Sequence, residues 1–202
     1  MPLSPTFDIW DVIVEPRYDT VFIPAAGTAG PLSFFTVPRG QGTSVFATAS
    51  SKTNADTNQI LASTLPSGYN FVLLGFRLMP SFNMTIADST LAFNGAVFTF
   101  TIGSKDYLTI PARTIPAGGG AVIGGAGVTT VAAHGFQALS NGFQIARKPL
   151  TLPQTVNYSA TLTWPGGAGQ AVTTTMAGGT TVGAAGLPIT LFMDGFLQRP
   201  TQ

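Results

Sequence analysis

Helix-breaking residues are spread so evenly along this chain that a long amphipathic helix fits nowhere in it. The 202 residues include 24 Gly, 15 Pro and 28 Thr. No window of 12 residues is free of helix breakers while keeping apolar side chains at the i, i+3, i+4 spacing of a helix face. The best helical stretch, residues 55–63 (ADTNQILAS), is short and rich in Thr and Asn. The sequence therefore predicts an all-β protein with little helix.

Short apolar or alternating segments separated by turn residues indicate strands. Residues 70–79 are apolar on both faces, as in a central strand covered on both sides, and they end at a proline, which cannot donate to a ladder. Residues 96–102 alternate, and a turn at 103–106 leads into a return strand at 107–110. Such a series favours an antiparallel β-sandwich or barrel. The other expected strands are 7–14, 20–23, 32–37, 142–146, 156–164, 171–175 and 187–197.

Two similar segments raise the question of one domain or two. Residues 64–71 (TLPSGYNF) resemble residues 151–158 (TLPQTVNY), and each precedes a long predicted strand. Two tandem sandwiches, the two halves of one jelly roll, or chance could produce this similarity. We favour a single domain over 20–202, because about 100 residues per barrel leave little room for long loops. The Gly-rich segments expected to form those loops are 117–127, 166–169 and 178–186.

The charge content excludes several classes of protein. Charged side chains make up 8% of the chain, with nine basic and eight acidic residues, whereas an ordinary soluble domain has roughly 25%. A net charge of +1 lacks the basic footprint of a nucleic-acid-binding protein. Because the chain has no Cys, disulfides, zinc–thiolate sites and Cys nucleophiles are excluded. No stretch has the length and apolarity of a membrane helix or the pattern of a secretory signal, so we expect synthesis inside the cell.

Half of the acidic residues lie in the first 19 positions. Residues 1–19 carry four acids and one base, whereas residues 20–202 carry an excess of bases. We interpret 1–19 as an acidic segment that lies on the basic body of its own or a neighbouring chain, as an inter-subunit arm; chance placement is the alternative. The candidate assembly-interface residues are Asp8, Asp11, Glu15, Arg17, Asp19 and Arg199.

Catalytic and cofactor motifs are missing from the sequence. It has no G-x-G-x-x-G, P-loop, H-E-x-x-H, EF-hand or G-x-S-x-G pattern. The only histidine, His134, has no acidic residue within 27 positions to orient it as a base, and a single His cannot form a multi-His metal site. We therefore expect no catalytic residue, no cofactor, no metal and no small-molecule substrate. A calcium ion held by loop carbonyls and one or two Asp stays open as an alternative.

A pair of carboxylates for glycoside chemistry is also hard to find. Asp8 and Asp11 point to opposite faces of a strand, and Asp11 and Glu15 would lie about 13 Å apart along one. These distances do not suit a carboxylate pair that flanks a sugar bond. The expectation is a protein that is not an enzyme. The remaining acids that could form a pair lie beside turn residues: Asp88, Asp106 and Asp194.

With those classes set aside, a low-charge β-protein rich in Thr, Gly and Ala suits permanent self-association, because obligate interfaces deplete charge at their centres. Five segments also make the chain resemble the small jelly-roll coat proteins of bacterial viruses, over about half its length. These segments are 65–71 (LPSGYNF), 98–108 (FTFTIGSKDYL), 147–153 (RKPLTLP), 158–165 (YSATLTWP) and 189–200 (ITLFMDGFLQRP).

This resemblance implies an eight-stranded jelly roll in an icosahedral virion shell, synthesised in the host cytoplasm. The implied partners are copies of the same chain, as trimers, pentamers or pseudo-hexamers, and other virion proteins. Many coat proteins that package a genome have a basic N-terminal arm, whereas this segment is acidic, so direct nucleic-acid binding is not expected. A neighbouring coat protein or an internal membrane is the expected inner partner. The alternatives are a phage tail, baseplate, fibre or receptor-binding protein, and a carbohydrate-binding β-sandwich module.

Overall fold

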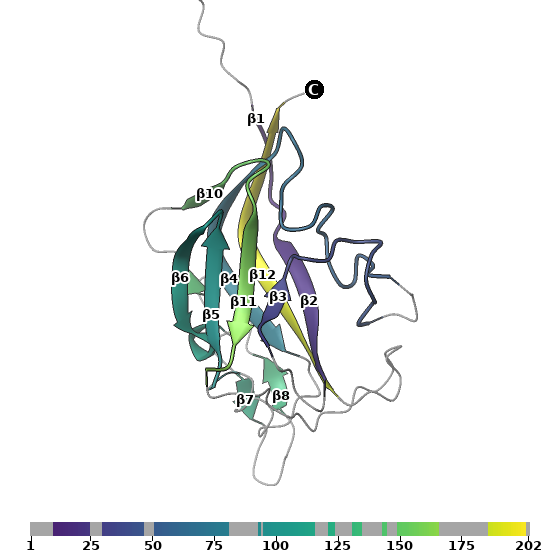
Figure 1. The fold of residues 1–202 in the computed structure, drawn as a ribbon, viewed down its shortest axis with the longest axis vertical. Helices are drawn as coiled ribbons and strands as arrows, with labels where there is room; N and C mark the ends of the chain where they lie inside the picture. Colours follow the sequence, from purple (N-terminus) through teal and green to yellow (C-terminus); the bar gives the residue numbers. More distant parts are fainter. Residues whose placement is uncertain are drawn as a thin grey trace, which may run out of the picture.

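Antiparallel strands make up nearly all of the regular secondary structure of the computed structural model (Figure 1). The structure describes residues 10–24, 30–46, 51–80, 93, 95–115, 121–123, 131–134, 143–144, 149–165 and 186–200. The strands are β1 (Trp10–Ile13), β2 (Arg17–Pro24), β3 (Leu32–Phe34), β4 (Asn70–Pro80), β5 (Val97–Ile102), β6 (Lys105–Pro111), β7 (Ala121–Ile123), β8 (Val131–His134), β9 (Phe143–Gln144), β10 (Leu150–Leu152), β11 (Tyr158–Thr163) and β12 (Gly186–Pro200). The 3-10 turn η2 (Ala112–Thr114) follows β6.

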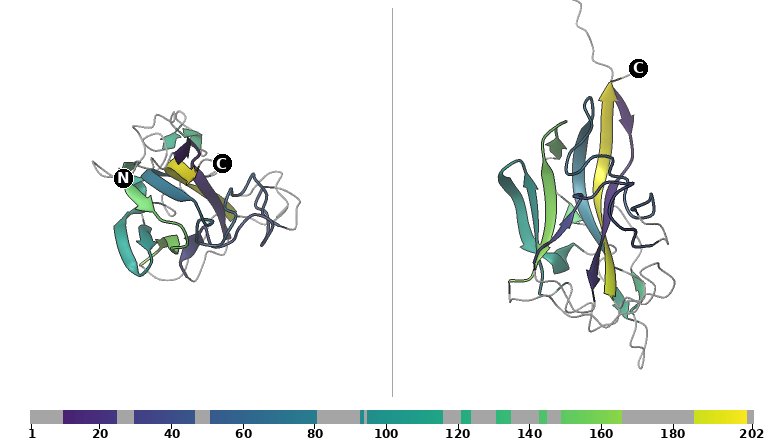
Figure 2. Two further views of the ribbon diagram at one scale, coloured as in Figure 1. Left: turned by 90° about the horizontal axis from the view of Figure 1, so that it is seen from above. Right: turned by 45° about the vertical axis from the view of Figure 1, so that its right-hand side comes forward.

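The strands form two antiparallel sheets that face one another (Figure 2). The large sheet has six strands in the order β1-β12-β4-β10. β1 and β2 pair with successive parts of the same edge of β12, and β9 pairs with β4. The small sheet has four strands in the order β3-β11-β5-β6, and β7 and β8 form a separate hairpin. The predicted all-β antiparallel architecture is therefore confirmed.

Alternate side chains of the two sheets fill the space between them. The ring of Phe76 on β4 packs edge-on against Phe98 and Phe100 of β5, with centroid distances of 5.1 and 4.9 Å. Met193 of β12 pairs with Phe76 and is fully buried. Tyr158 of β11 packs on Phe35, with centroids 5.8 Å apart. The period-two apolar pattern of the strands therefore builds one core between two sheets.

A β-bulge adjusts the longest pairing in the molecule. Opposite the step from Asp194 to Gly195 in β12, β4 contains one extra residue, Leu74. An inserted residue reverses which side chains of a strand face inward. All four large apolar side chains that flank Leu74 on β4 are consequently buried in the core: Phe71, Leu73, Phe76 and Leu78.

Several sequence expectations differ from the structure. Residues 55–63 form no helix; Thr57 instead makes an isolated antiparallel bridge with Asp19 of β2. Of the strand expected at 142–146, the structure describes only residues 143–144, which form β9, and the segment 117–127, expected to be a loop, contains β7. Strand β10 was not expected. The strand expected at 171–175 lies outside the described residues.

The boundary expected at residue 19 falls inside a strand. β2 begins at Arg17, and β1 pairs with the last residues of β12, from Trp10 opposite Pro200 to Ile13 opposite Leu197. Residues 10–13 and 17–19 are therefore part of the large sheet. Residues 1–9, which include Asp8, lie outside the described residues.

We expect Gly195→Ala to destabilise the fold. A Cβ atom at this position would lie 2.0 Å from the carbonyl oxygen of Val72 and 2.8 Å from Cζ of Phe71. Because neither the ladder nor the buried ring can move away freely, the free energy of unfolding should fall by about 1–3 kcal/mol, measured by urea unfolding. Gly30→Ala is the matched control, since a Cβ there meets no atom within 4 Å. Equal losses in the two variants would contradict this account of the bulge.

Candidate functional site

The connection between β3 and β4 lies against the open edge of β2 (Figure 1). The amide of Thr20 donates to the carbonyl of Asp56 at 2.9 Å, and the amide of Asn58 donates to the carbonyl of Tyr18 at 3.3 Å. These bonds satisfy backbone groups that an edge strand would otherwise expose. We name residues 36–69 the β3–β4 connection; of these, 36–46 and 51–69 are described.

The carboxylate of Asp56 holds this connection in its shape. It accepts hydrogen bonds from the amides of Val45 (2.6 Å), Phe46 (3.2 Å) and Thr53 (2.8 Å), and from the hydroxyls of Ser44 (2.8 Å) and Thr53 (2.9 Å). Burial alone would raise the pKa of Asp56, but these donors outweigh it and hold the pKa below its ordinary value. One side chain therefore fixes two separate turns of the connection.

A second buried carboxylate joins the connection to β2. Asp19 forms an ion pair with Lys52 at 2.5 Å and accepts the amide of Phe35 at 2.7 Å. Lys52 also donates to the carbonyl of Thr20 at 2.9 Å. Burial raises the pKa of Asp19, and the attraction of Lys52 opposes the rise. The Asp19–Lys52 ion pair therefore holds the β3–β4 connection against β2.

Gln59 links the connection to both sheets. Its amide nitrogen donates to the carbonyls of Leu61 (2.6 Å) and Thr64 (3.0 Å). Its oxygen accepts from Nη2 of Arg17 on β2 at 3.1 Å and from the hydroxyl of Tyr158 on β11 at 2.8 Å. Burial raises the pKa of Tyr158, so this hydroxyl stays protonated and able to donate.

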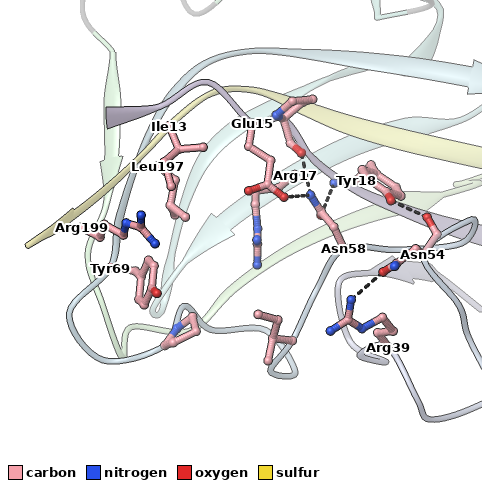
Figure 3. Close-up of a pocket in the computed structure, with 13 residues that line it drawn as sticks. Ile13, Glu15, Arg17, Tyr18, Arg39, Asn54, Asn58, Tyr69, Leu197 and Arg199 are labelled. Carbon is pink, nitrogen blue, oxygen red and sulfur yellow. Dashed lines mark hydrogen bonds between the residues drawn. The ribbon is translucent and has the colours of Figure 1, made fainter. Parts of the chain in front are cut away.

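An open groove of about 810 Å³ lies between this connection and the strands β1, β2 and β12 (Figure 3). Its one end is formed by Ile13, Leu197 and Arg199. Its other end is formed by Arg39 and Asn54, which hydrogen-bond through their side chains at 2.6 Å. The volume lies within the roughly 300–1,000 Å³ of ligand-binding pockets.

Three arginines and two tyrosines give the groove its chemistry. Arg17 lies in the wall with 3% of its surface exposed, and its Nε has no partner in the part of the chain that the structure describes. Tyr69 lies near Arg199, and Tyr18 donates its hydroxyl to the carbonyl of Asn54. Burial, and secondarily the charge of Glu15, raise the pKa of Tyr18. The groove is therefore cationic and aromatic.

The structure places three of the six expected interface residues, Glu15, Arg17 and Arg199, in the lining of this groove. Asp11 pairs with Arg199 at 2.8 Å, and Glu15 accepts the side-chain amide of Asn58 at 3.1 Å. Both members of the Asp11–Arg199 pair remain partly exposed. Asp19, in contrast, is buried away from the groove, and Arg17 lies almost fully buried in the groove wall.

Sequence reasoning missed the residues that complete the site. Lys52 and Asp56 are the only charged residues between positions 40 and 76, and that isolation was the available signal. Asn58, Gln59 and Tyr69 carry no local pattern that distinguishes them from ordinary loop residues.

Of the three acids considered for glycoside chemistry, the two that the structure describes, Asp106 and Asp194, lie in different sheets. Asp194 of β12 forms a two-bond ion pair with Arg77 of β4 at 2.5 and 2.6 Å, and Arg77 also lies 4.7 Å from the ring centroid of Phe192. Asp106 lies on β6 in the other sheet, where it accepts the hydroxyl of Thr101 at 2.7 Å. Asp88 lies outside the described residues.

His134 ends β8 opposite Ala121 of β7. Among the residues that the structure describes, no group of three or more His, Cys, Asp or Glu could hold a metal ion. Within the same residues, no helix has the length and apolar character needed to span a membrane. No protein-family model, curated protein or solved structure matches the chain. The functional interpretation therefore depends on strand pairing and on the groove.

Asp56→Asn should loosen the β3–β4 connection. An amide group would leave several buried donors without an anionic acceptor, and each such loss costs about 1–3 kcal/mol. We expect the free energy of unfolding in urea at pH 7 to fall by roughly 3 kcal/mol or more. Asp106→Asn, which removes an exposed carboxylate with one hydroxyl donor, is the control and should change it by less than about 0.5 kcal/mol.

The effect of Asp56 should also depend on pH. Because its folded-state pKa is lowered, its stabilisation is present above the unfolded-state pKa of about 3.9 and is lost as the pH falls through the folded-state value. The difference in the free energy of unfolding between the native chain and Asp56→Asn should therefore be constant from pH 7 to 5 and shrink at pH 3. A difference that stays unchanged at pH 3 would contradict an ionised Asp56.

Lys52→Met should leave Asp19 buried without its cation. We expect this to lower the free energy of unfolding by about 3–5 kcal/mol at pH 7. The folded-state pKa of Asp19 would then lie further above the unfolded value, so stability is lost as the pH rises through that interval. Lowering the pH from 7 to 4.5 should therefore return the variant toward the native chain in urea unfolding. The double variant Asp19→Asn with Lys52→Met should lack this pH dependence, and Lys105→Met, at an exposed site, is the control.

Proposed function

We propose that the chain is a single jelly roll. A jelly roll joins eight antiparallel strands so that the first pairs with the eighth, the second with the seventh, the third with the sixth and the fourth with the fifth. In this chain β2 pairs with β12, β3 with β11, β4 with β10, and β5 with β6, all antiparallel. These four pairings support the proposal, and β1, β7, β8 and β9 are additions to it.

From this arrangement we infer a structural protein of a bacteriophage shell, which assembles from copies of itself. The jelly-roll pairing carries the inference, since viral capsid subunits are a principal use of this architecture. The low charge of the chain supports it, because a net charge near zero promotes association. The inferred role is structural, with no catalytic residue, and the inferred partners are further copies of the chain and other virion proteins.

The exposed apolar residues suggest which side meets a neighbour. Val12 is 51% and Val14 is 84% exposed, in β1 and directly after it. Phe46, Ile60 and Leu61 of the β3–β4 connection are also exposed. These five belong to elements on the β1 and β2 side of β12, whereas two further exposed residues of this kind, Leu74 of β4 and Tyr107 of β6, lie elsewhere. Large apolar side chains gathered on one side are typical of a protein interface.

A second candidate is a carbohydrate-binding module, which jelly rolls also provide. The groove favours it to a degree, because aromatic rings beside polar groups suit a sugar. The tail, baseplate, fibre and receptor-binding alternatives share the same composition and fold.

Measuring the mass of the purified chain by size-exclusion chromatography with light scattering tests the proposal. We expect concentration-dependent growth into large assemblies, and closed shells by electron microscopy. A chain that stays monomeric at high concentration would count against a shell protein, and tubes or fibres would favour a tail component. Binding to a glycan array by a monomeric chain would favour the carbohydrate-binding module.

Val12→Asp combined with Val14→Asp should block assembly without unfolding the monomer. Both side chains are exposed in the single chain, so the charges disturb only a contact that forms between chains. We expect the light-scattering mass to fall to that of a small species, while the free energy of unfolding in urea stays within about 0.5 kcal/mol of the native value. The variant with Thr at both positions is the control, because it keeps the shape and should retain assembly.

A further inference from the structure

The groove beside β1 has the chemistry to bind a proline-containing segment that also carries an acid. Tyr18 and Tyr69 contribute aromatic rings, and Pro16, Pro66 and Ile60 contribute apolar surface. Aromatic-lined grooves bind polyproline II segments, whose extended backbone loses little entropy on binding. The groove is partly open to solvent, so a chain segment could enter it without a change of fold.

The charges of the groove indicate the sign of the occupant. Arg39 is exposed, and its side-chain partner is the neutral Asn54. Arg17 is almost fully buried in the wall, bonds to the neutral Gln59, and has an Nε without a partner in the described part of the chain. Even with Arg199 paired to Asp11 and with Glu15 present, the groove keeps one positive charge in excess. An occupant with one carboxylate would balance it.

The chain itself contains such a segment. Residues 1–9 read MPLSPTFDI, with a P-x-x-P pattern at Pro2 and Pro5, apolar Phe7 and Ile9, and Asp8 as the only charged side chain. P-x-x-P segments favour the polyproline II conformation. We propose that residues 1–9 of one copy bind in the groove of a second copy and so connect neighbouring subunits. This inference rests on the proposed function and assigns the contact that joins the copies.

The direction of β1 favours a second copy over the same chain. Ile13 lies at the groove, and β1 leads away from it to Trp10 over about 10 Å. Asp8 lies two residues before Trp10, so its Cα atom is at most about 7 Å from that of Trp10. A segment that turned back along its own β1 would therefore keep Asp8 short of Arg39, at the far end of the groove. A neighbouring copy meets no such restriction.

Variants on the two sides of this contact test it in the full-length chain. In the arm, Pro2→Ala with Pro5→Ala, and separately Asp8→Asn, should weaken association at least tenfold by sedimentation velocity. In the groove, Tyr69→Ala and Arg39→Ala should do the same. Ser4→Ala in the arm and Tyr107→Ala, an exposed tyrosine of β6 on the other sheet, are the matched controls and should leave association unchanged. Near-UV circular dichroism checks that each variant is folded.

Mixing the variants separates exchange between copies from binding within one chain. A Pro2→Ala, Pro5→Ala chain keeps an intact groove, and an Arg39→Ala chain keeps an intact arm. If the arm of one copy enters the groove of another, the mixture should associate more strongly than either variant alone. A mixture no stronger than its components would overturn the proposal, because it would mean that the arm acts only within its own chain or not at all.

A synthetic peptide of residues 1–9 gives a second measurement. It should bind the full-length chain by fluorescence anisotropy, compete with association of the native chain, and lose at least tenfold in affinity when Asp8 is replaced by Asn. Shells that form normally with every arm and groove variant would overturn this inference and leave the proposed function standing. Complementary pairs that associate, together with a native chain that associates without building a shell, would support the inference and count against the shell function.

Discussion

Two buried carboxylates determine where the β3–β4 connection lies, and the groove depends on that position. Taking a carboxylate out of water is costly unless donors or a cation replace the water. Asp56 meets this requirement with amides and hydroxyls of its own connection, and Asp19 meets it with Lys52. Because Asp19 belongs to β2 and Lys52 to the connection, the ion pair holds the connection against the edge of the large sheet. Without it, the groove would lose the wall that carries Arg39 and Asn54.

The strands that could be predicted are those whose burial follows a simple period. Residues 96–102 alternate and form β5, while residues 70–79 are apolar throughout and form β4. The prediction of a helix at residues 55–63 was wrong because the polar side chains of this segment form hydrogen bonds with residues distant in sequence, which the local sequence does not reveal. Thr57, for example, donates to the carbonyl of Tyr18, which lies 39 positions earlier. β10 is only three residues long and depends on its pairing with β4.

The candidate site was predictable only in part, for a related reason. The early cluster of acids drew attention to Asp11, Glu15 and Asp19, but a count of charges along the sequence could not reveal the partners of these side chains within the chain. Asp19 is neutralised by a lysine 33 positions later, and Asp11 by an arginine near the other end of the chain. Partners so distant in sequence become visible only when the strands are paired. Charge counted along a chain therefore overstates the charge that its surface offers to another molecule.

The same pairing sharpens the meaning of the low charge content. Three ion pairs, Lys52–Asp19, Arg77–Asp194 and Arg199–Asp11, use six of the charged side chains, and Arg17 and Asp56 are buried as well. The part of the chain that the structure describes therefore exposes less unpaired charge than its composition indicates. A surface of this kind opposes contact between copies only weakly, since repulsion between like-charged copies scales with the charge they expose. Selective association then requires shape and a few placed charges, and a groove with unneutralised arginines supplies both.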